Sequence, residues 1–317
     1  MPADRSKFRK RGSVIVITAL IITNLITAGW LLVELRSEND KTANPYPLID
    51  IMRNFIPQEH FIVNIQPLRE ELRALVEREG KNSITLYFEF LNTGANVSIN
   101  PDLRIWPASL PKLPMAMTVM KRIENGTWSL DNELVLFEQD KDFGYGKLFE
   151  RPVGTRFTIE ELLEEMLVRS DNAAYRILLR NTDLSELVGV IQETGLEDLF
   201  TEGGRVSAKE YSRLFRSLYT SSFLERENSQ KILSLLAQSE FRDFLTSGVP
   251  ADIPFSHKFG IDRDEHVYLD AGIVYAPNRP YLLAVMVKGT GVAGEEEKVK
   301  QLMKEMSEKA YTYVSQQ

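Results

Sequence analysis

The spacing of apolar residues divides the chain into segments of different kinds, and the first segment is a continuous apolar run. It extends from Val14 to Val33 without a charged residue. As a helix it would span about 30 Å, the thickness of a bilayer's hydrocarbon core. Five basic residues precede it: Arg5, Lys7, Arg9, Lys10 and Arg11. This pattern predicts a cytoplasmic flank over residues 1–13, a single transmembrane anchor over residues 14–35, and a position outside the cytoplasm for the rest of the chain.

A cleaved signal peptide that ends near Ala28 is the competing interpretation of the same run. The apolar residues continue past Ala28 through Trp30 to Val33, which favours an uncleaved anchor. Residues 36–66 mix charged residues, proline turns and apolar residues without clean periodicity. They indicate a stalk or collar, and we expect part of it to lie against the domain that follows.

Residues 67–317 carry the patterns of a folded domain. Apolar residues recur at helical spacing from Pro67 onward, and Gly80 ends the pattern. Apolar and polar residues then alternate over 84–90, and turn residues at 92–95 lead to a second short strand through Ile99. Together these segments predict a helix followed by a β-hairpin.

The middle of this domain is helical, and strands return near its end. Thr158 and Glu161 form a capping box for a helix that should end near Ser170. The remaining patterns predict helices near 173–179, 208–219 and 229–236, strands near 267–275 and 281–287, and a closing helix around 299–310. The order favours an α+β fold with an antiparallel sheet built from both chain ends and packed with a helical block, preceded by one N-terminal transmembrane helix.

Composition narrows the chemistry that this domain can perform. The 317 residues include no cysteine, which removes thiol catalysis, thiolate metal sites and disulfides. The net charge of −7 argues against a nucleic-acid partner, because phosphate binding depends on clustered basic residues. We therefore expect chemistry based on oxygen and nitrogen groups.

A serine with a nearby lysine is the best candidate for a nucleophile and its base. The chain has three histidines: His60, His257 and His266. None lies in a recognisable nucleophile elbow, so a Ser-His-Asp triad is not indicated. Ser109 and Lys112 begin a predicted helix, where residues three apart are about 5–6 Å apart between Cβ atoms. Lys112 can act as a base if burial and a second cation lower its pKa.

Two further short motifs follow in the chain. Ser-Asp-Asn at 170–172 lies where one predicted helix ends and another begins, and Lys-Phe-Gly at 258–260 lies in a predicted strand. Taken alone, each motif has an ordinary structural explanation, such as a helix cap at 109 or at 170–171. His257 is explained as a packed histidine, and the polar residues at 262–266 as a solvated turn rather than a metal site.

Taken together, the three ordered motifs resemble the set S-x-x-K, S-D-N and K-T-G of class A β-lactamases and penicillin-binding proteins. The resemblance covers about residues 68–314, including Leu-Asp-Asn-Glu-Leu at 130–134. It implies that Ser109 attacks a carbonyl and is acylated, with Lys112 as the proton acceptor. Ser170 and Lys258 would pass a proton to the departing nitrogen, and Asn172 would hold Lys112 and the substrate amide. No cofactor and no metal is implied.

The resemblance also implies an oxyanion site, and two features depart from the family pattern. The oxyanion would lie between the backbone N–H groups of Ser109 and Ile261, the residue after Gly260. Phe259 replaces a threonine or serine whose hydroxyl helps to hold the substrate carboxylate. The ring cannot donate that bond, so either the substrate is not an ordinary penicillin or other groups hold its carboxylate. If the ring covers the place of the carboxylate, Phe259→Thr should speed the acylation of Ser109 by ordinary penicillins. The loop after the second motif is short, and Glu202 is the one acid in it that could act as a deacylation base.

The sequence therefore predicts a membrane-anchored, extracytoplasmic serine hydrolase. Its expected substrates are β-lactams or the D-Ala-D-Ala ends of peptidoglycan stem peptides. The alternative is a slow-turnover or non-catalytic penicillin- or peptidoglycan-binding module on the same fold. That alternative is favoured by the Phe259 replacement and by the short loop, and it is opposed by the intact set of motif residues.

Overall fold

The structure is a computed structural model. It describes Thr23, Asn24, Thr27, Gly29, Leu48 and residues 64–196 and 204–316. The cytoplasmic flank and most of both the anchor and the stalk or collar predicted for residues 1–66 lie outside the described residues. Of the helices in the described part of the chain, none combines the length and the apolar character needed to cross a bilayer.

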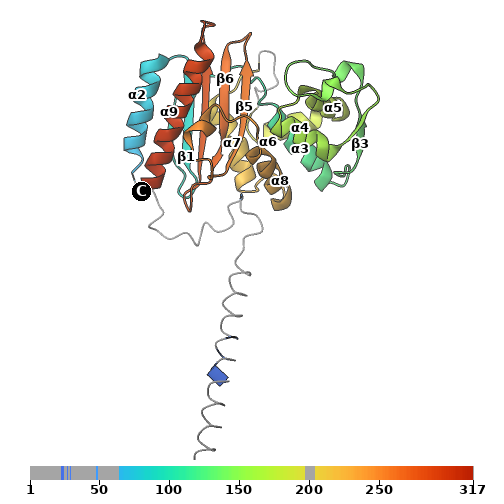
Figure 1. Ribbon diagram of the computed structural model, residues 1–317, viewed down its shortest axis with the longest axis horizontal. Coiled ribbons are helices and arrows are strands. Elements are labelled where there is room, and N and C mark those ends of the chain that lie inside the picture. The colour runs from blue at the N-terminus through green and yellow to red at the C-terminus, as the bar shows by residue number, and fades with distance from the viewer. Residues whose placement is uncertain are drawn as a thin grey trace, which may run out of the picture. The chain divides into compact units, whose positions relative to one another are not determined.

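The folded domain is organised around one antiparallel sheet of five strands in the order β2-β1-β7-β6-β5 (Figure 1). The strands are β1 (Ile84–Phe90), β2 (Ala95–Ile99), β5 (Phe255–Asp262), β6 (Val267–Val274) and β7 (Tyr281–Lys288). The first two strands precede the helices of the middle segment and the last three follow them. The sheet is thus built from both ends of the domain, which confirms the predicted fold class.

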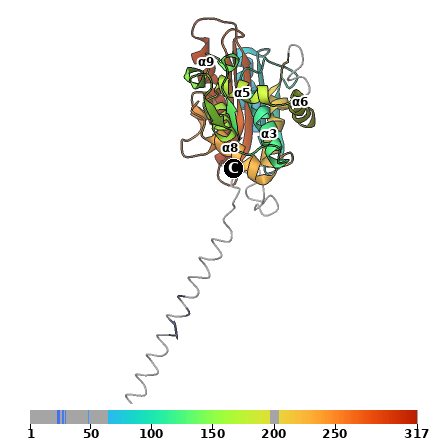
Figure 2. The same cartoon turned by 90° about the vertical axis from the view of Figure 1, so that its right-hand side faces the viewer.

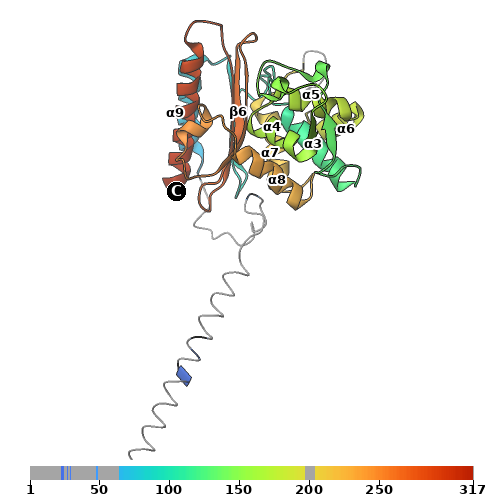
Figure 3. The same ribbon diagram turned by 45° about the vertical axis from the view of Figure 1, so that its right-hand side comes forward.

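Helices cover both faces of this sheet (Figure 3). The α-helices are α2 (Gln66–Gly80), α3 (Lys112–Glu124), α4 (Ile159–Val168), α5 (Asn172–Asn181), α6 (Leu184–Glu193), α7 (Ala208–Tyr219), α8 (Arg226–Ala237) and α9 (Glu295–Gln316). Helices α2 and α9 pack together on one side of the sheet, whereas α7 and α8 contact strands on the other side. Helices α3 to α6 form a block beyond them, on the β5 side of the sheet (Figure 1), and in the view of Figure 2 helices α3, α5 and α6 of this block are turned toward the viewer.

Burial on both faces modifies the alternating pattern expected for β1. Every residue of this strand is buried, including Glu89 on the polar side of the alternation. The Glu89 carboxylate accepts hydrogen bonds from the Tyr87 hydroxyl and from Arg216 of α7. The polar face of β1 is therefore an internal, paired face beneath α7 rather than a solvated one.

Three features of the fold were not predicted in detail. Helix α6 and the two-stranded sheet of β3 (Glu133–Val135) and β4 (Arg156–Thr158) were not assigned from the pattern. Helix α3 begins at Lys112, so Ser109 lies in the preceding turn rather than in the helix. By contrast, Leu48 from the predicted stalk or collar lies against the domain as expected, since its N–H donates a hydrogen bond to the Gln230 side chain at 2.9 Å.

Candidate active site

The turn before α3 presents Ser109 at the edge of the sheet. The preceding Ala108 has a φ of 45°, in the left-handed region that a non-glycine residue seldom adopts. Hydrogen bonds from the N–H of Leu110 to Pro107 and from the N–H of Lys112 to Ser109 close the turn. The Ser109 side chain is thus held on a sharp turn that leads directly into a helix.

Lys112 connects the nucleophile to the second motif. Its Nζ lies 3.3 Å from the Ser109 Oγ, 3.1 Å from the Ser170 Oγ and 2.6 Å from the Asn172 Oδ1, and it also donates to the Ser170 carbonyl. Lys258 reaches the same place from β5, with its Nζ 2.9 Å from the Ser170 Oγ. The structure therefore brings together the five residues that the sequence predicted to meet.

Ser170 is positioned by an unusual backbone conformation. Its φ is 55°, and its side chain is completely buried between the two lysines. This conformation ends α4 and turns the Ser170 carbonyl toward Lys112, while Asp171 begins α5 as its N-cap. The same two residues, Ser170 and Asp171, therefore cap a helix and form part of the active site.

Burial is the main cause of the unusual protonation of the two lysines. Lys112 is 3% exposed, and burial lowers its pKa from about 10.5 to about 7 although the carboxylates of Asp171 and Asp142 raise it. Burial lowers the pKa of Lys258 well below its ordinary value, and the charge of Lys112 lowers it further. Desolvation is therefore the main cause at both lysines, and the charge of Lys112 adds to it at Lys258.

The edge of β5 supplies backbone groups to the cleft. The N–H of Tyr275 donates to Pro254 just before β5 begins, and hydrogen-bonded and open positions alternate along an antiparallel pair. By this alternation the N–H of Ile261 faces away from β6, toward the open edge. A Cβ on Gly260 would lie 3.2 Å from the Ser109 nitrogen, so glycine permits the close approach of strand and nucleophile. The two N–H groups expected for an oxyanion site, those of Ser109 and Ile261, are therefore held near each other.

The ring of Phe259 lies in the core rather than in the cleft. It is 2% exposed and stacks on Phe241 with ring centroids 3.8 Å apart, while the edge of Tyr145 packs against it at 6.0 Å. The expectation that this ring covers the place of a substrate carboxylate is therefore wrong. The Phe259 carbonyl has a different role, because it accepts a hydrogen bond from the Lys258 ammonium at 3.0 Å.

Two aspartates that the sequence did not single out as site residues organise the second motif. The buried Asp171 accepts hydrogen bonds from the N–H groups of Lys147 and Leu148, which ties the loop of residues 141–150 to α5. Asp142 on this loop accepts a hydrogen bond from the Asn172 Nδ2 at 2.8 Å. This bond orients the amide so that its oxygen faces Lys112. Asp142 lies in an irregular segment, so no periodic pattern could have identified it.

Burial raises the pKa of the Asp142 carboxyl, but the hydrogen bonds from Asn172 and Gly144 and the charge of Arg176 lower it below its ordinary value overall. Asp142 is therefore a stable anion beside the site.

These side chains border a cleft of about 800 Å³. It is lined by Trp106, Ala108, Ser109, Pro111, Lys112, Gln139, Asp140, Asp142, Asn172, Tyr175, Arg176, Leu179, Arg180 and Asp262. Among the described residues, no carboxylate oxygen hydrogen-bonds to Ser109 or to Lys112, and no group of three or more metal-ligating side chains occurs. Glu202, the acid considered for deacylation, lies outside the described residues.

Lys112 is a buried lysine beside a partly buried serine on a turn, and the pair of Ser170 and Lys258 lies next to it. This arrangement is typical of an active-site-serine acyl-transfer centre. Comparison with known proteins agrees with this class. The sequence model of the "Beta-lactamase enzyme family" matches residues 67–314, so the chain belongs to that family. A β-lactamase from Streptomyces lavendulae is 26% identical to it, over 68% of this chain and 77% of that protein.

Solved structures show the same fold. PBP-A has a TM-score of 0.72 and 23% identity, covering 80% of this chain and 97% of the other. A β-lactamase from Sphaerobacter thermophilus has a TM-score of 0.71 and 20% identity, with 80% and 99% covered. A point mutant of PBP-A, solved as an acyl-enzyme complex with penicillin G, has a TM-score of 0.72 and 23% identity, with 80% and 98% covered.

Proposed function

We propose that this protein is a membrane-anchored, extracytoplasmic serine hydrolase that forms an acyl-enzyme on β-lactams or on the D-Ala-D-Ala ends of cell-wall peptides. Membership of the β-lactamase enzyme family supports the β-lactam substrate. The apolar run at 14–33 and its basic flank support the anchor. The observation that carries the proposal is the buried Lys112, whose Nζ lies 3.3 Å from the Ser109 Oγ and whose pKa is lowered to about 7.

The first step is attack on the carbonyl carbon of the substrate. Neutral Lys112 accepts the hydroxyl proton of Ser109, and the Ser109 oxygen forms a bond to that carbon. The negative charge that develops on the carbonyl oxygen is stabilised by the N–H groups of Ser109 and Ile261, which are already oriented before the reaction. Because these groups are fixed by the turn and by the strand, little reorganisation is needed.

The second step is departure of the leaving nitrogen. The Ser170 hydroxyl lies between the two lysine amines, 3.1 Å from Lys112 and 2.9 Å from Lys258. Ser170 can donate its proton to the nitrogen as the bond to carbon breaks, and it recovers a proton from a neighbouring lysine. The proton taken from Ser109 thus returns to the leaving group, and the acyl group remains on Ser109.

Mass spectrometry of the full-length protein exposed to a reactive penicillin tests the proposal. We expect one adduct with the mass of the intact drug, located on Ser109 by peptide mapping. The Ser109→Ala variant should show no adduct. In a folded wild-type protein, failure to form an adduct with several penicillins and cephalosporins would instead support the non-catalytic binding module.

A second measurement distinguishes the two substrate classes. An acylated D-Ala-D-Ala peptide should release D-alanine when it is incubated with the protein if the peptidase activity is present, and the Ser109→Ala variant controls for contaminating peptidases. Adduct formation with penicillin but no release of D-alanine would restrict the function to β-lactams.

Membrane fractionation tests the anchor. The full-length protein should remain with the membrane after a salt wash, and protease added from outside intact spheroplasts should remove the domain. Release by salt or protection from the protease would exclude the proposed topology.

A further inference from the structure

The residues of strand β5 distinguish the two sides of the cleft on either side of Ser109. Gly260 lies beside the Ser109 nitrogen, with Lys258 two residues before it and Asp262 two residues after it. Since a strand rises about 3.3 Å per residue, Lys258 and Asp262 are about 13 Å apart along the strand, on opposite sides of the nucleophile. Lys258 marks the side of the leaving group, because it contacts Ser170. Asp262 therefore marks the side that receives the acyl portion of the substrate.

The two residues at the acyl side have complementary properties. Trp106 is 37% exposed, and its indole Nε1–H donates to the Asp262 carboxylate at 3.1 Å. Both side chains line the same cleft as Ser109. An aromatic face and a carboxylate placed together are two independent attractions for an ammonium group, one through the ring quadrupole and one through charge.

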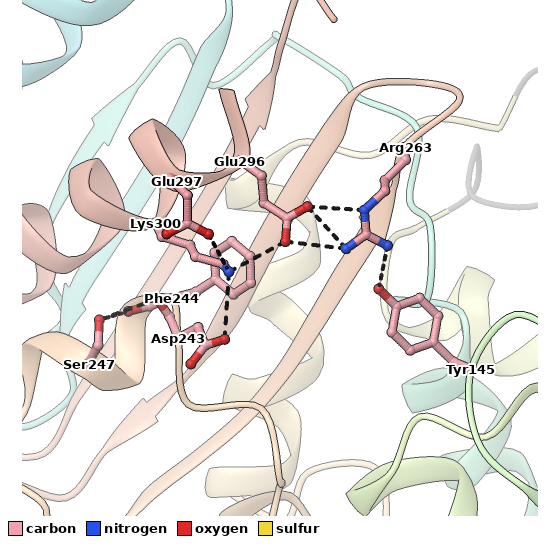
Figure 4. A network of polar contacts seen from close by, with 8 residues as sticks. All are labelled: Tyr145, Asp243, Phe244, Ser247, Arg263, Glu296, Glu297 and Lys300. Atoms are coloured by element: carbon pink, nitrogen blue, oxygen red, sulfur yellow. Dashed lines mark hydrogen bonds and ion pairs between the residues drawn. The ribbon is translucent and has the colours of Figure 1, made fainter. Parts of the chain in front are cut away.

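The charge of Asp262 is not balanced by a neighbouring base. The guanidinium of the next residue, Arg263, contacts Glu296 and the Tyr145 hydroxyl (Figure 4). In the described part of the chain no lysine or arginine forms an ion pair with Asp262; its second oxygen accepts only the N–H groups of Asp264 and Glu265.

The other acids of the cleft are neutralised. Asp140 pairs with Arg180 at 2.8 Å, and Asp142 pairs with Arg176 at 2.6 Å. Of the described residues that line the cleft, Asp262 is therefore the acid that leaves an uncompensated negative charge beside the substrate.

We propose that Asp262 and Trp106 select substrates whose acyl side chain carries an ammonium group. This inference rests on the proposed function, because it assigns the acyl side of the acylation site. It predicts a preference for β-lactams with a free amine on the acyl side chain, and for cell-wall peptides that carry a free amine on the acyl side of the scissile bond.

Three penicillins with the same ring system and a phenylacetyl-type side chain provide the test. Benzylpenicillin has an uncharged side chain, ampicillin adds an α-amino group, and carbenicillin adds an α-carboxylate. Second-order acylation constants are measured on the full-length protein at about pH 6.5, below the usual α-amino pKa of about 7.7–8.0. We expect ampicillin to acylate fastest and carbenicillin slowest.

Asp262→Asn is the informative variant, because the amide oxygen can still accept the N–H groups of Asp264 and Glu265. The ratio of the ampicillin constant to the carbenicillin constant should fall by about three- to tenfold, as expected for one partly exposed charge. Asp264→Asn removes the same charge from the same turn, at an exposed position outside the cleft, and should leave the ratio unchanged.

The possible outcomes distinguish failure of the acyl-side role of Asp262 from failure of the proposed acylation activity. If all three drugs form adducts but Asp262→Asn keeps the wild-type ratio, the acyl-side assignment is overturned and the proposed function stands. If both variants lower the ratio equally, the effect is that of overall charge, and the assignment is also overturned. If none of the drugs forms an adduct, the proposed function fails together with this inference.

Discussion

Burial of Lys112 has a consequence for both reactivity and stability. An ordinary lysine is almost entirely protonated at neutral pH and cannot accept the Ser109 proton. With its pKa lowered to about 7, a large fraction of Lys112 is neutral at that pH. The same burial gives Lys112 a lower proton affinity in the folded protein than in the unfolded chain, so the stability of the fold depends on pH.

Acylation should therefore rise with pH through about 7 and reach a plateau above it, because the neutral amine is the reactive form. The measurement is the second-order acylation constant for one penicillin as a function of pH. Lys112→Met keeps most of the side-chain volume but removes the base, and it should lower the constant by about 10²–10⁴-fold. A constant that does not change across neutral pH would exclude Lys112 as the base.

Lys112 should also make the free energy of unfolding rise with pH. Between about 7 and 10.5 the unfolded chain binds more protons at Lys112 than the folded chain does, so its contribution to the free energy of unfolding rises with pH over this window. As the pH falls from about 10.5 to about 7 this contribution is lost, and below about 7 it no longer changes. Denaturant titrations of wild type and Lys112→Met at pH 6.5 and 9 should show a smaller pH dependence in the variant.

Phe259 gives a prediction opposite to the one that family resemblance alone suggests. Because its ring is buried against Phe241 and Tyr145, Phe259→Thr should leave a cavity and bury a hydroxyl, at a cost of about 3–5 kcal/mol in the free energy of unfolding. Acylation should not become faster. Phe259→Leu should cost less, because it fills more of the space. A well-folded threonine variant with faster acylation would show that the ring does restrict the cleft.

At the scale of the elements, the N-terminus of α5 is hydrogen-bonded to the loop of residues 141–150, which borders the active site. Asp171 is completely buried and accepts three backbone hydrogen bonds: one from Ala174 within α5, and two from Lys147 and Leu148 across the site. A cap that also binds a distant loop couples the helix start to the position of that loop.

Asp171→Asn should destabilise the protein by about 1–3 kcal/mol, because the amide NH₂ cannot accept the N–H groups that face it. The rate of amide hydrogen exchange should increase most at Lys147 and Leu148. Acylation should become slower, because the loop of residues 141–150 is less firmly held. Asp183→Asn changes the exposed N-cap of α6, whose hydrogen bonds to Ser185 stay within the first turn, and should have a much smaller effect. Equal effects of the two variants would show that Asp171 acts only as a cap.

The elements also show what the sequence could and could not predict. Periodic patterns predicted the hairpin of β1 and β2, the helices α4, α5, α7 and α8 and the late strands. The three-residue spacing also predicted the contact of Ser109 with Lys112, although Ser109 lies in the turn before α3 rather than in the helix. The cleft walls at Trp106, Asp142 and Asp262 could not be predicted in the same way. They lie in irregular segments or at a strand end, where position depends on long-range packing rather than on a local period.

At the scale of the whole molecule, the cleft is well equipped for acylation, but its described residues provide no carboxylate for the water that must follow. Asp140, Asp142 and Asp262 are engaged with other partners and none hydrogen-bonds to Ser109 or Lys112. A general base typically contributes about 10²–10⁴-fold to such a step.

The acyl-enzyme should therefore persist. We expect a chromogenic cephalosporin to give one stoichiometric burst followed by slow hydrolysis, and mass spectrometry should show the adduct throughout the slow phase. Rapid multiple turnover would contradict this prediction. Loss of such turnover in Glu202→Gln would then identify Glu202 as the base.

The edge position of β5 also creates a risk of aggregation. Its outward N–H and C=O groups, which include the N–H of Ile261, are also the groups that another strand would use to extend the sheet. In the folded domain the turn that carries Ser109 and the second-motif residues lie against this edge. A partly unfolded form in which the helical block separates from the sheet would expose a long strand ready for intermolecular pairing. Variants that loosen the block should therefore aggregate before they lose the sheet.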